Sequence, residues 1–234
     1  MSKGKIVYAA CVVLAANSGF AAADSVKFMG DVNFQSDLQA NMQINLPSFD
    51  TQGGTLVLTD VMVEFIHSGS VDIAGDNDDN FQGTMANGRL VRSWTGSGPG
   101  GAFGFGNRTE TTPFFNLAPN DGDGGNTASF DPTAPDGFGP VNLAYGPETT
   151  QIVFPPEAAY ATPGPGNVIF DIDVLLMVND NQFVPTAPDA WQLEVENPLL
   201  NVKVSVTYEY TPEPATLAMM AFGLLGLRRK SHRS

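Results

Sequence analysis

The sequence predicts an all-β protein whose central domain is an antiparallel, jelly-roll-like β-sandwich with long Gly/Pro-rich loops. Its apolar stretches are β-branched and in part alternate with a two-residue period. The 25 glycines and 17 prolines among 234 residues divide the chain into strand-sized segments. No stretch shows a convincing 3.6-residue period with helix caps. With 42% hydrophobic residues, the chain has enough apolar side chains to form a core.

Three stretches give the strongest strand signals: residues 55–66, 167–178 and 202–210. In the last, valines and tyrosines alternate with polar residues, which predicts one buried and one exposed face. Shorter strands are expected at 25–29, 41–46, 90–94, 151–154 and 191–195. Residues 96–166 are expected to form mainly surface loops with short edge strands.

The N-terminus has the plan of a secretory signal. Two lysines precede an apolar run at residues 6–16, and Ala21 to Ala23 supply the small side chains that a signal peptidase requires. We expect residues 1–23 to be removed, so that the mature chain begins at Asp24. The only cysteine, Cys11, lies in this segment, and the mature chain would therefore have no thiol.

The C-terminus, residues 212–234, has three parts in order. Pro212, Glu213 and Pro214 form a tripeptide that neither a helix nor a strand can run through. The apolar run at 215–227 is expected to form a short helix, which at 1.5 Å per residue reaches roughly 20 Å, less than the roughly 30 Å of a bilayer core. A basic cluster follows, made of Arg228, Arg229, Lys230 and Arg233. This predicts a transient association with the inner membrane.

The order Pro-Glu-Pro-Ala-Thr-Leu, a Gly/Leu-rich run and Arg-Arg-Lys resembles the PEP-CTERM sorting signal. The resemblance implies export in a Gram-negative, often polysaccharide-producing bacterium, and an exosortase that handles the tail during delivery to the cell surface or extracellular matrix.

The central domain, residues 24–211, resembles choice-of-anchor E domains at its two ends. The resemblance is carried by Leu46-Pro47-Ser48-Phe49-Asp50 with the following Gly53-Gly54-Thr55-Leu56, and by the closing strand at 204–210. It implies a β-rich extracellular domain that ends in a sorting signal, and it implies no activity.

Charge excludes nucleic acid as a partner. The formal net charge is −14, and most of the basic residues lie in the two terminal segments. Between Asp24 and Thr211, five basic residues stand against 24 acidic ones. Such a surface repels phosphate backbones.

Catalytic chemistry has little support in the residue inventory. His67 is the only histidine between the terminal segments, and no Gly-x-Ser-x-Gly motif accompanies it. One histidine without cysteine does not make a typical zinc site. We therefore expect His67 at a solvated strand end and no enzymatic activity, although the strand carboxylates leave a glycoside hydrolase open.

Two acidic loops are candidate calcium sites, at residues 76–80 and 120–126. They concentrate short oxygen-bearing side chains and glycines, which suits a cation that takes six to eight oxygen ligands. The predicted ligands are Asp76, Asp78, Asp79, Asp121 and Asp123. Solvated turns have the same composition, and calcium is the only cofactor that the sequence suggests.

Trp94 and Trp191 are candidates for stacking against a sugar. We expect an exported, non-enzymatic cell-surface or matrix protein associated with extracellular polysaccharide. The alternatives are a carbohydrate-binding module and a carbohydrate-active hydrolase.

Overall fold

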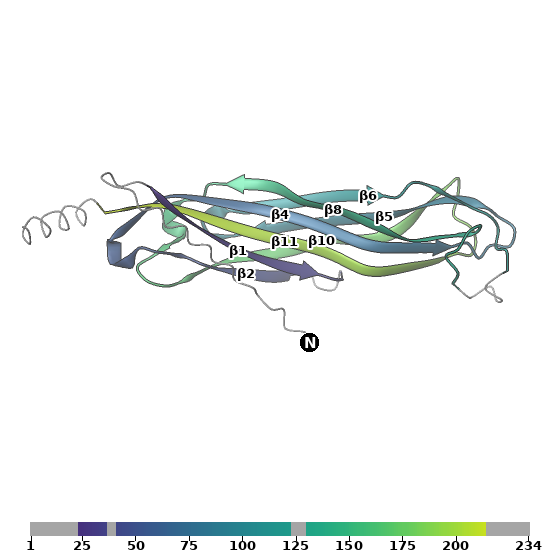
Figure 1. Cartoon of the computed structure of the whole chain (residues 1–234), viewed down its shortest axis with the longest axis horizontal. Helices are drawn as coiled ribbons and strands as arrows, with labels where there is room; N and C mark the ends of the chain where they lie inside the picture. Colours follow the sequence, from purple (N-terminus) through teal and green to yellow (C-terminus); the bar gives the residue numbers. More distant parts are fainter. Residues whose placement is uncertain (1–22, 37–40, 123–129, 214–234) are drawn as a thin grey trace, which may run out of the picture.

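Two antiparallel sheets of long, twisted strands lie face to face in the computed structural model (Figure 1), which describes residues 23–36, 41–122 and 130–213. The first sheet has the order β1 (Asp24–Phe34), β11 (Gln192–Pro212), β4 (Leu56–Asp76) and β8 (Gly137–Val153). The second has the order β2 (Asn41–Pro47), β10 (Asn167–Val184), β5 (Thr84–Ser97) and β6 (Phe103–Thr111), and β7 (Phe115–Leu117) pairs with β5. The predicted β-sandwich is confirmed.

Short elements complete the chain between the strands. β3 (Phe49–Asp50) and β9 (Ala161–Thr162) form a small parallel pair. Three 3₁₀ turns, η1 (Gln52–Gly54), η2 (Pro99–Gly101) and η3 (Glu157–Ala159), lie in connections. The predicted C-terminal helix lies outside the described residues.

The sandwich is elongated, and its two ends differ. At the tail end, β1 begins at Asp24 and β11 ends at Pro212 (Figure 1). At the far end, β4 ends at Asp76, opposite the first residues of β8 and β11. β11 runs between these ends and pairs with β1 and β4.

The alternation predicted for residues 202–210 is present in β11. Val202, Val204, Val206 and Tyr208 are fully buried, because they face the second sheet. The other strong strand signals also fall on strands, since 55–66 without Thr55 is the first part of β4 and 167–178 is most of β10.

The expectation for 96–166 was right in placing edge strands among connecting segments and wrong about the length of those strands. This stretch contains all of β6, which has nine residues, and all of β8, which has 17. Both are edge strands, and their glycines and prolines lie within the strands instead of between them.

The core consists of two apolar clusters along the long axis. The tail-end cluster includes Phe65, Trp94, Phe170 and Tyr208, and the far-end cluster includes Ile73. Polar side chains occupy the interior between them.

Candidate functional site

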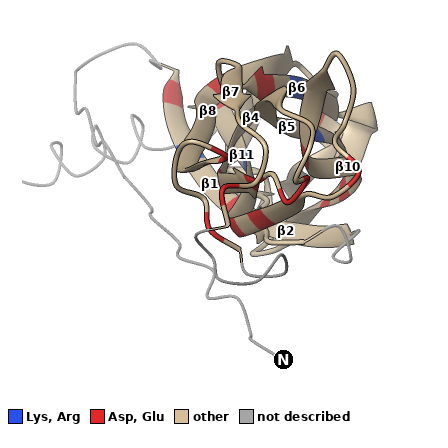
Figure 2. Cartoon of the chain, turned by 90° about the vertical axis from the view of Figure 1, so that its right-hand side faces the viewer, with Lys and Arg blue, Asp and Glu red and all other residues tan. Residues whose placement is uncertain are grey.

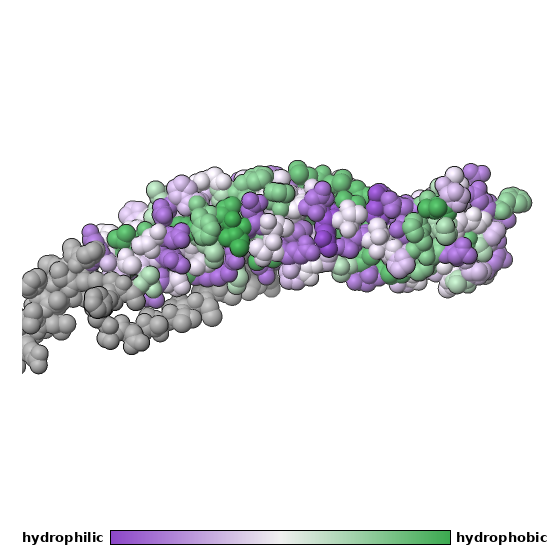
Figure 3. All heavy atoms as spheres, turned by 90° about the horizontal axis from the view of Figure 1, so that it is seen from above, coloured by the Kyte–Doolittle hydropathy of each residue, from purple (hydrophilic) through white to green (hydrophobic). Residues whose placement is uncertain are grey.

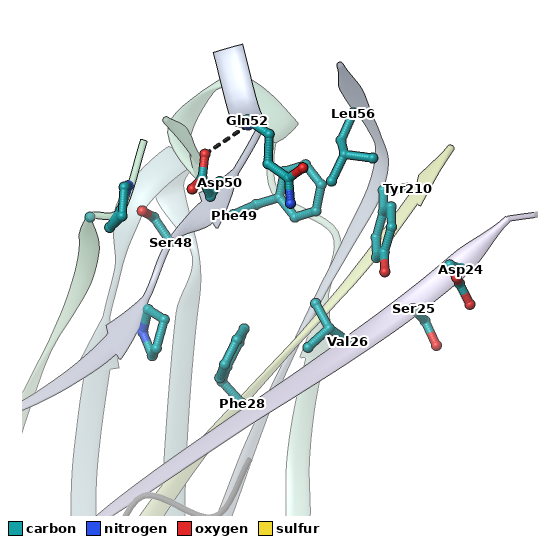
Figure 4. Close-up of a pocket in the computed structure, with 13 residues that line it drawn as sticks. Asp24, Ser25, Val26, Phe28, Ser48, Phe49, Asp50, Gln52, Leu56 and Tyr210 are labelled. Carbon is teal, nitrogen blue, oxygen red and sulfur yellow. Dashed lines mark hydrogen bonds between the residues drawn. The ribbon is translucent and has the colours of Figure 1, made fainter. Parts of the chain in front are cut away.

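A cleft of about 380 Å³ opens at the tail end (Figure 4). Its walls come from β1, from β11 and from the segment that joins β2 to β4. Phe28, Phe49 and Tyr210 are its aromatic lining, and Val26 and Leu56 add aliphatic surface. The cleft therefore lies where the domain begins and ends in sequence.

The aromatic lining is held in place by packing and one interlayer hydrogen bond. The rings of Phe49 and Tyr210 have centroids 5.1 Å apart, and Phe28 lies 6.0 Å from the buried ring of Tyr208. The Tyr208 hydroxyl donates to the carbonyl oxygen of Pro47 at 2.9 Å, which joins β11 to β2. The cleft is therefore preformed, as small-molecule sites usually are.

Polar groups line the same cleft. Asp50 Oδ1 accepts a hydrogen bond from the backbone N–H of Gln52 at 2.7 Å. The Gln52 side chain lies beside the Phe49 ring (Figure 4). Asp24 stands near Tyr210, whose pKa is raised, first by burial and then by the Asp24 charge. Aromatic faces next to carboxylate and amide groups can contact the apolar face and the hydroxyls of a sugar ring at once.

Part of this cleft was visible in the sequence without being recognised as a site. Pro47, Ser48, Phe49 and Asp50 all line it, and they belong to the stretch that carries the choice-of-anchor E resemblance. The remaining lining residues come from distant segments. Only the pairing of β1 with β11 brings Phe28 close to Tyr210.

Trp94 is not available for stacking against a ligand. It is fully buried, with its ring 6.2 Å from Phe65 and 5.6 Å from His67. Trp94 also ends the strand predicted at 90–94, and its side chain lies in the core. Trp191 is 36% exposed and packs edge-on against Phe183 at 5.0 Å.

His67 was expected at a solvated strand end, and this was wrong. β4 continues nine residues beyond it, to Asp76, and its side chain is 2% exposed. Its Nδ1 lies 3.1 Å from the Tyr145 hydroxyl, and Nε2 lies 3.9 Å from a Glu148 oxygen. Burial lowers the pKa of His67, so the ring is neutral at neutral pH.

Arg92 is a second charged or titratable side chain that is buried between the sheets, and sequence reasoning missed it. It is fully buried between the two apolar clusters. Its donors bond to the carbonyl oxygens of Val91, Val178, Ser70 and Leu199 and to Asn179 Oδ1, at 2.8–3.2 Å. Burial lowers its pKa to about 10, so it stays charged. Because its partners lie on β4, β5, β10 and β11, it joins the two sheets.

The predicted calcium loops meet at the far end. Asp76, Asp78 and Asp79 lie there. The backbone N–H of Asn120, next to Asp121, donates a hydrogen bond to the Asp79 carbonyl oxygen at 2.9 Å. Asp123 lies outside the described residues. Within the described part of the chain, no three His, Asp or Glu side chains are already arranged to hold a metal ion. The calcium site stays a prediction.

The terminal signals are described only in part. Ala23, Asp24, Pro212 and Glu213 are described. The exposed Glu213 donates its amide to the carbonyl oxygen of Thr55 at 2.9 Å, so β11 leads directly into the tripeptide. The other predicted signal residues, Ala21, Pro214, Arg228, Arg229, Lys230 and Arg233, lie outside the described residues. Across the described ranges, no helix is long and apolar enough to span a bilayer.

One long face of the molecule carries apolar areas separated by hydrophilic ones (Figure 3). Exposed aromatic residues such as Phe103 and Phe105 on β6 contribute to the apolar surface of the molecule. Scattered apolar residues of this kind are normal on a soluble surface. The cleft is therefore the better candidate for a specific ligand.

A long β-sandwich that runs straight into a Pro-Glu-Pro sequence has the organisation expected of a folded domain followed by a sorting signal. Residues 211–231 match the model of the PEP-CTERM protein-sorting motif. The match implies export and cell-surface sorting in a Gram-negative bacterium, with an exosortase as the processing partner.

No curated protein matches the chain. Among solved structures it is similar to a chain of the "Structure of infectious bursal disease virus Gt strain", at 10% identity and a TM-score of 0.15. The match covers 88% of this chain and 46% of that chain. A TM-score this low carries no argument about fold or function.

Proposed function

We propose that the mature protein is a non-enzymatic component of the cell surface or extracellular matrix that binds exopolysaccharide through the tail-end cleft. Signal peptidase releases residues 1–23, and the C-terminal tail holds the protein at the inner membrane only transiently. The observation that carries the ligand class is the composition of the cleft: three aromatic rings beside Asp24, Asp50 and Gln52.

The shape of the cleft suits one or two sugar units. About 380 Å³ lies within the usual range of small-ligand pockets, at its lower end. A pyranose ring offers C–H groups on its face, which the negative faces of the partly exposed Phe28 and Tyr210 attract, and hydroxyls at its edge, which Asp50 and Gln52 can bond. A polymer could pass through, because the cleft is open to solvent.

The non-enzymatic assignment rests on how the candidate catalytic groups are bonded. His67 is engaged with Tyr145 in the interior, and two of the strand carboxylates, Asp171 and Asp173, bond to Gln43 and Asn41 of the neighbouring strand β2. Groups that are held by structural partners in this way are poor candidates for proton transfer to a substrate.

The test is binding of the exported protein, purified from its host, to the exopolysaccharide of the same host and to a glycan panel. We expect saturable binding to at least one polysaccharide, weakened about tenfold by Phe28→Ala, because a loss of about 1.4 kcal/mol corresponds to one aromatic contact. Gln52→Ala, on an exposed side chain, provides a second variant that leaves the core intact.

Phe105→Ala is the matched control, since Phe105 is an exposed aromatic on the β6 edge, away from the cleft. Unchanged binding in this variant together with weaker binding in the two cleft variants supports the proposal. Absence of binding on the whole panel, or equal losses in all three variants, would contradict it. Release of reducing sugar from any glycan would contradict the non-enzymatic assignment.

A further inference from the structure

The far end of the sandwich brings carboxylates from separate segments together (Figure 2). Asp76 ends β4, and Asp78 follows in the loop to β5. Asp136 immediately precedes β8, and its backbone carbonyl oxygen accepts a hydrogen bond from the backbone N–H of Asn77 at 3.1 Å. Asp131 donates its amide to Asp76 Oδ2 at 2.8 Å. Two segments about 55 residues apart in sequence thus share one acidic cluster.

These carboxylates are buried without a cationic partner. Asp76, Asp78 and Asp136 are only 6%, 7% and 2% exposed. The ion pairs between described residues involve Glu64, Glu110, Glu148 and Asp180, and none of them lies at this cluster. Burying several charges of one sign is costly unless an opposite charge or a proton compensates.

Asp136 supplies an independent indication that the cluster can bind a cation. Its Oδ2 accepts the Asp121 amide at 2.9 Å, but its buried Oδ1 has no hydrogen-bond partner among the described residues. The carboxylate also lies close enough to Asp76 that its charge helps to raise the pKa of Asp76, after the larger effect of burial. A buried carboxylate oxygen without a donor, held beside another carboxylate, is suited to a cation.

We propose that this cluster binds a calcium ion through the carboxylates of Asp76, Asp78 and Asp136. Only oxygen donors are available here, which favours calcium over zinc or copper. The three carboxylates do not yet surround one point, so binding draws them together, and backbone carbonyls and water complete the six to eight ligands. The site lies at the opposite end from the sugar cleft and does not depend on it.

Asp79, which the sequence also suggested, has a different role. Its oxygens accept backbone hydrogen bonds from Phe81, Gln82 and Asp189 at 2.8–3.1 Å, and these bonds lower its pKa. They hold the loop between β4 and β5 in shape. Asp79 therefore positions the ligands and does not itself bind the ion.

The test is thermal unfolding and calorimetric titration of the purified exported protein, with calcium and with EDTA. At calcium about 100-fold above Kd, we expect the melting temperature to rise by about 5–10 °C for a domain of this size. Asp136→Asn should abolish this response. In EDTA the variant should melt at or above the wild-type temperature, because an amide at this position removes repulsion and can donate to Asp76.

Asp189→Asn is the matched control, because Asp189 is an exposed carboxylate at the same end. It should respond to calcium like the wild type. Three results would overturn the proposal: no calcium-dependent shift or heat of binding, a full response in Asp136→Asn, or an equal loss in Asp189→Asn, which would indicate diffuse attraction of ions. Stabilisation on mild acidification without any calcium response would show that a shared proton compensates the cluster instead.

Discussion

Replacing Gly104 by alanine should destabilise the protein, although alanine is normally the better strand residue. Gly104 lies on the edge strand β6, directly over the ring of the buried Phe65 on β4. An added Cβ would lie 2.6 and 2.7 Å from Phe65 Cδ2 and Cδ1, where ordinary contacts begin near 3.4 Å. Its φ is not in the left-handed region, so the effect is steric and not conformational.

The magnitude follows from two opposing effects. Alanine reduces the entropy of the unfolded chain and would by itself stabilise the protein by about 0.4–1 kcal/mol. Forcing a methyl group into a packed core costs about 1–3 kcal/mol, and Phe65 has little room to move because Gly96 also contacts its ring. We expect a net loss of about 1–2 kcal/mol, which is a fall of roughly 2–8 °C in melting temperature.

The assay is urea and thermal unfolding followed by tryptophan fluorescence, since the buried Trp94 packs against Phe65. Gly164→Ala is the control, because nothing lies within 4 Å of a Cβ at that position. Adding Phe65→Leu to Gly104→Ala should cost less than the sum of the two single changes, because the smaller side chain makes room. A Gly104→Ala variant as stable as Gly164→Ala would refute this account of β6.

Three further changes test the interior polar groups by chemical unfolding. Tyr208→Phe removes the bond to the Pro47 carbonyl and should cost about 1 kcal/mol, with an unchanged m value. Lysine has three N–H donors where arginine has five, so Arg92→Lys should lower the free energy of unfolding by at least about 2 kcal/mol. An unchanged stability would show that the backbone carbonyls find other partners. Because folding lowers the pKa of His67, this imidazole binds a proton more readily in the unfolded chain than in the folded one. The free energy of unfolding of the wild type should therefore fall as the pH drops through about 6.5. His67→Gln should lack this decrease, and parallel pH profiles for both proteins would contradict the prediction.

The sequence predicted those strands whose own residues carry the hydrophobic period. β11 and β10 were found because alternating or continuous apolar side chains signal burial locally. β6 was missed because its inward positions are Gly104 and Gly106, over which rings from other strands pack: Phe65 and Trp94. The apolar side chains that fill this edge belong to neighbouring strands. The sequence of β6 alone therefore carries no hydrophobic pattern.

β8 was missed for a different reason. Its two Gly-Pro pairs read as turns, whereas Gly139 and Gly146 adopt positive φ at irregularities in the pairing with β4. An edge strand accommodates proline, because on its outer side no neighbouring strand needs a hydrogen bond from the backbone N–H that proline lacks. Bulges and edge position are properties of the sheet, so they become visible only when the strand order is known.

The cleft and the acidic cluster were predictable to different degrees. Composition marked Asp76 and Asp78, because aspartate-rich loops stand out in a sequence, but the partner Asp136 lies in an unremarkable stretch. The tail-end cleft depends on the register of β1 against β11, which places Val26 opposite Tyr208 and Asp24 opposite Tyr210. Trp94 was wrongly proposed as a ligand contact, because the sequence around a single aromatic residue in a strand does not show whether the side chain faces the core or the solvent.

Residues 24–213 contain no cysteine, so no disulfide can join the two sheets. Secreted domains often rely on disulfides, whereas here Arg92 and Tyr208 join the two sheets by hydrogen bonds. Neither lies at the far end, where carboxylates repel each other instead. A calcium ion there would offset this repulsion and strengthen the connection that hydrogen bonds already make between the end of β4 and the segment before β8. Extracellular calcium modules bind at about 10⁻⁴–10⁻³ M, so a site of this class would remain empty in the cytoplasm and fill after export. The far end would then gain its stability in the compartment where the protein works.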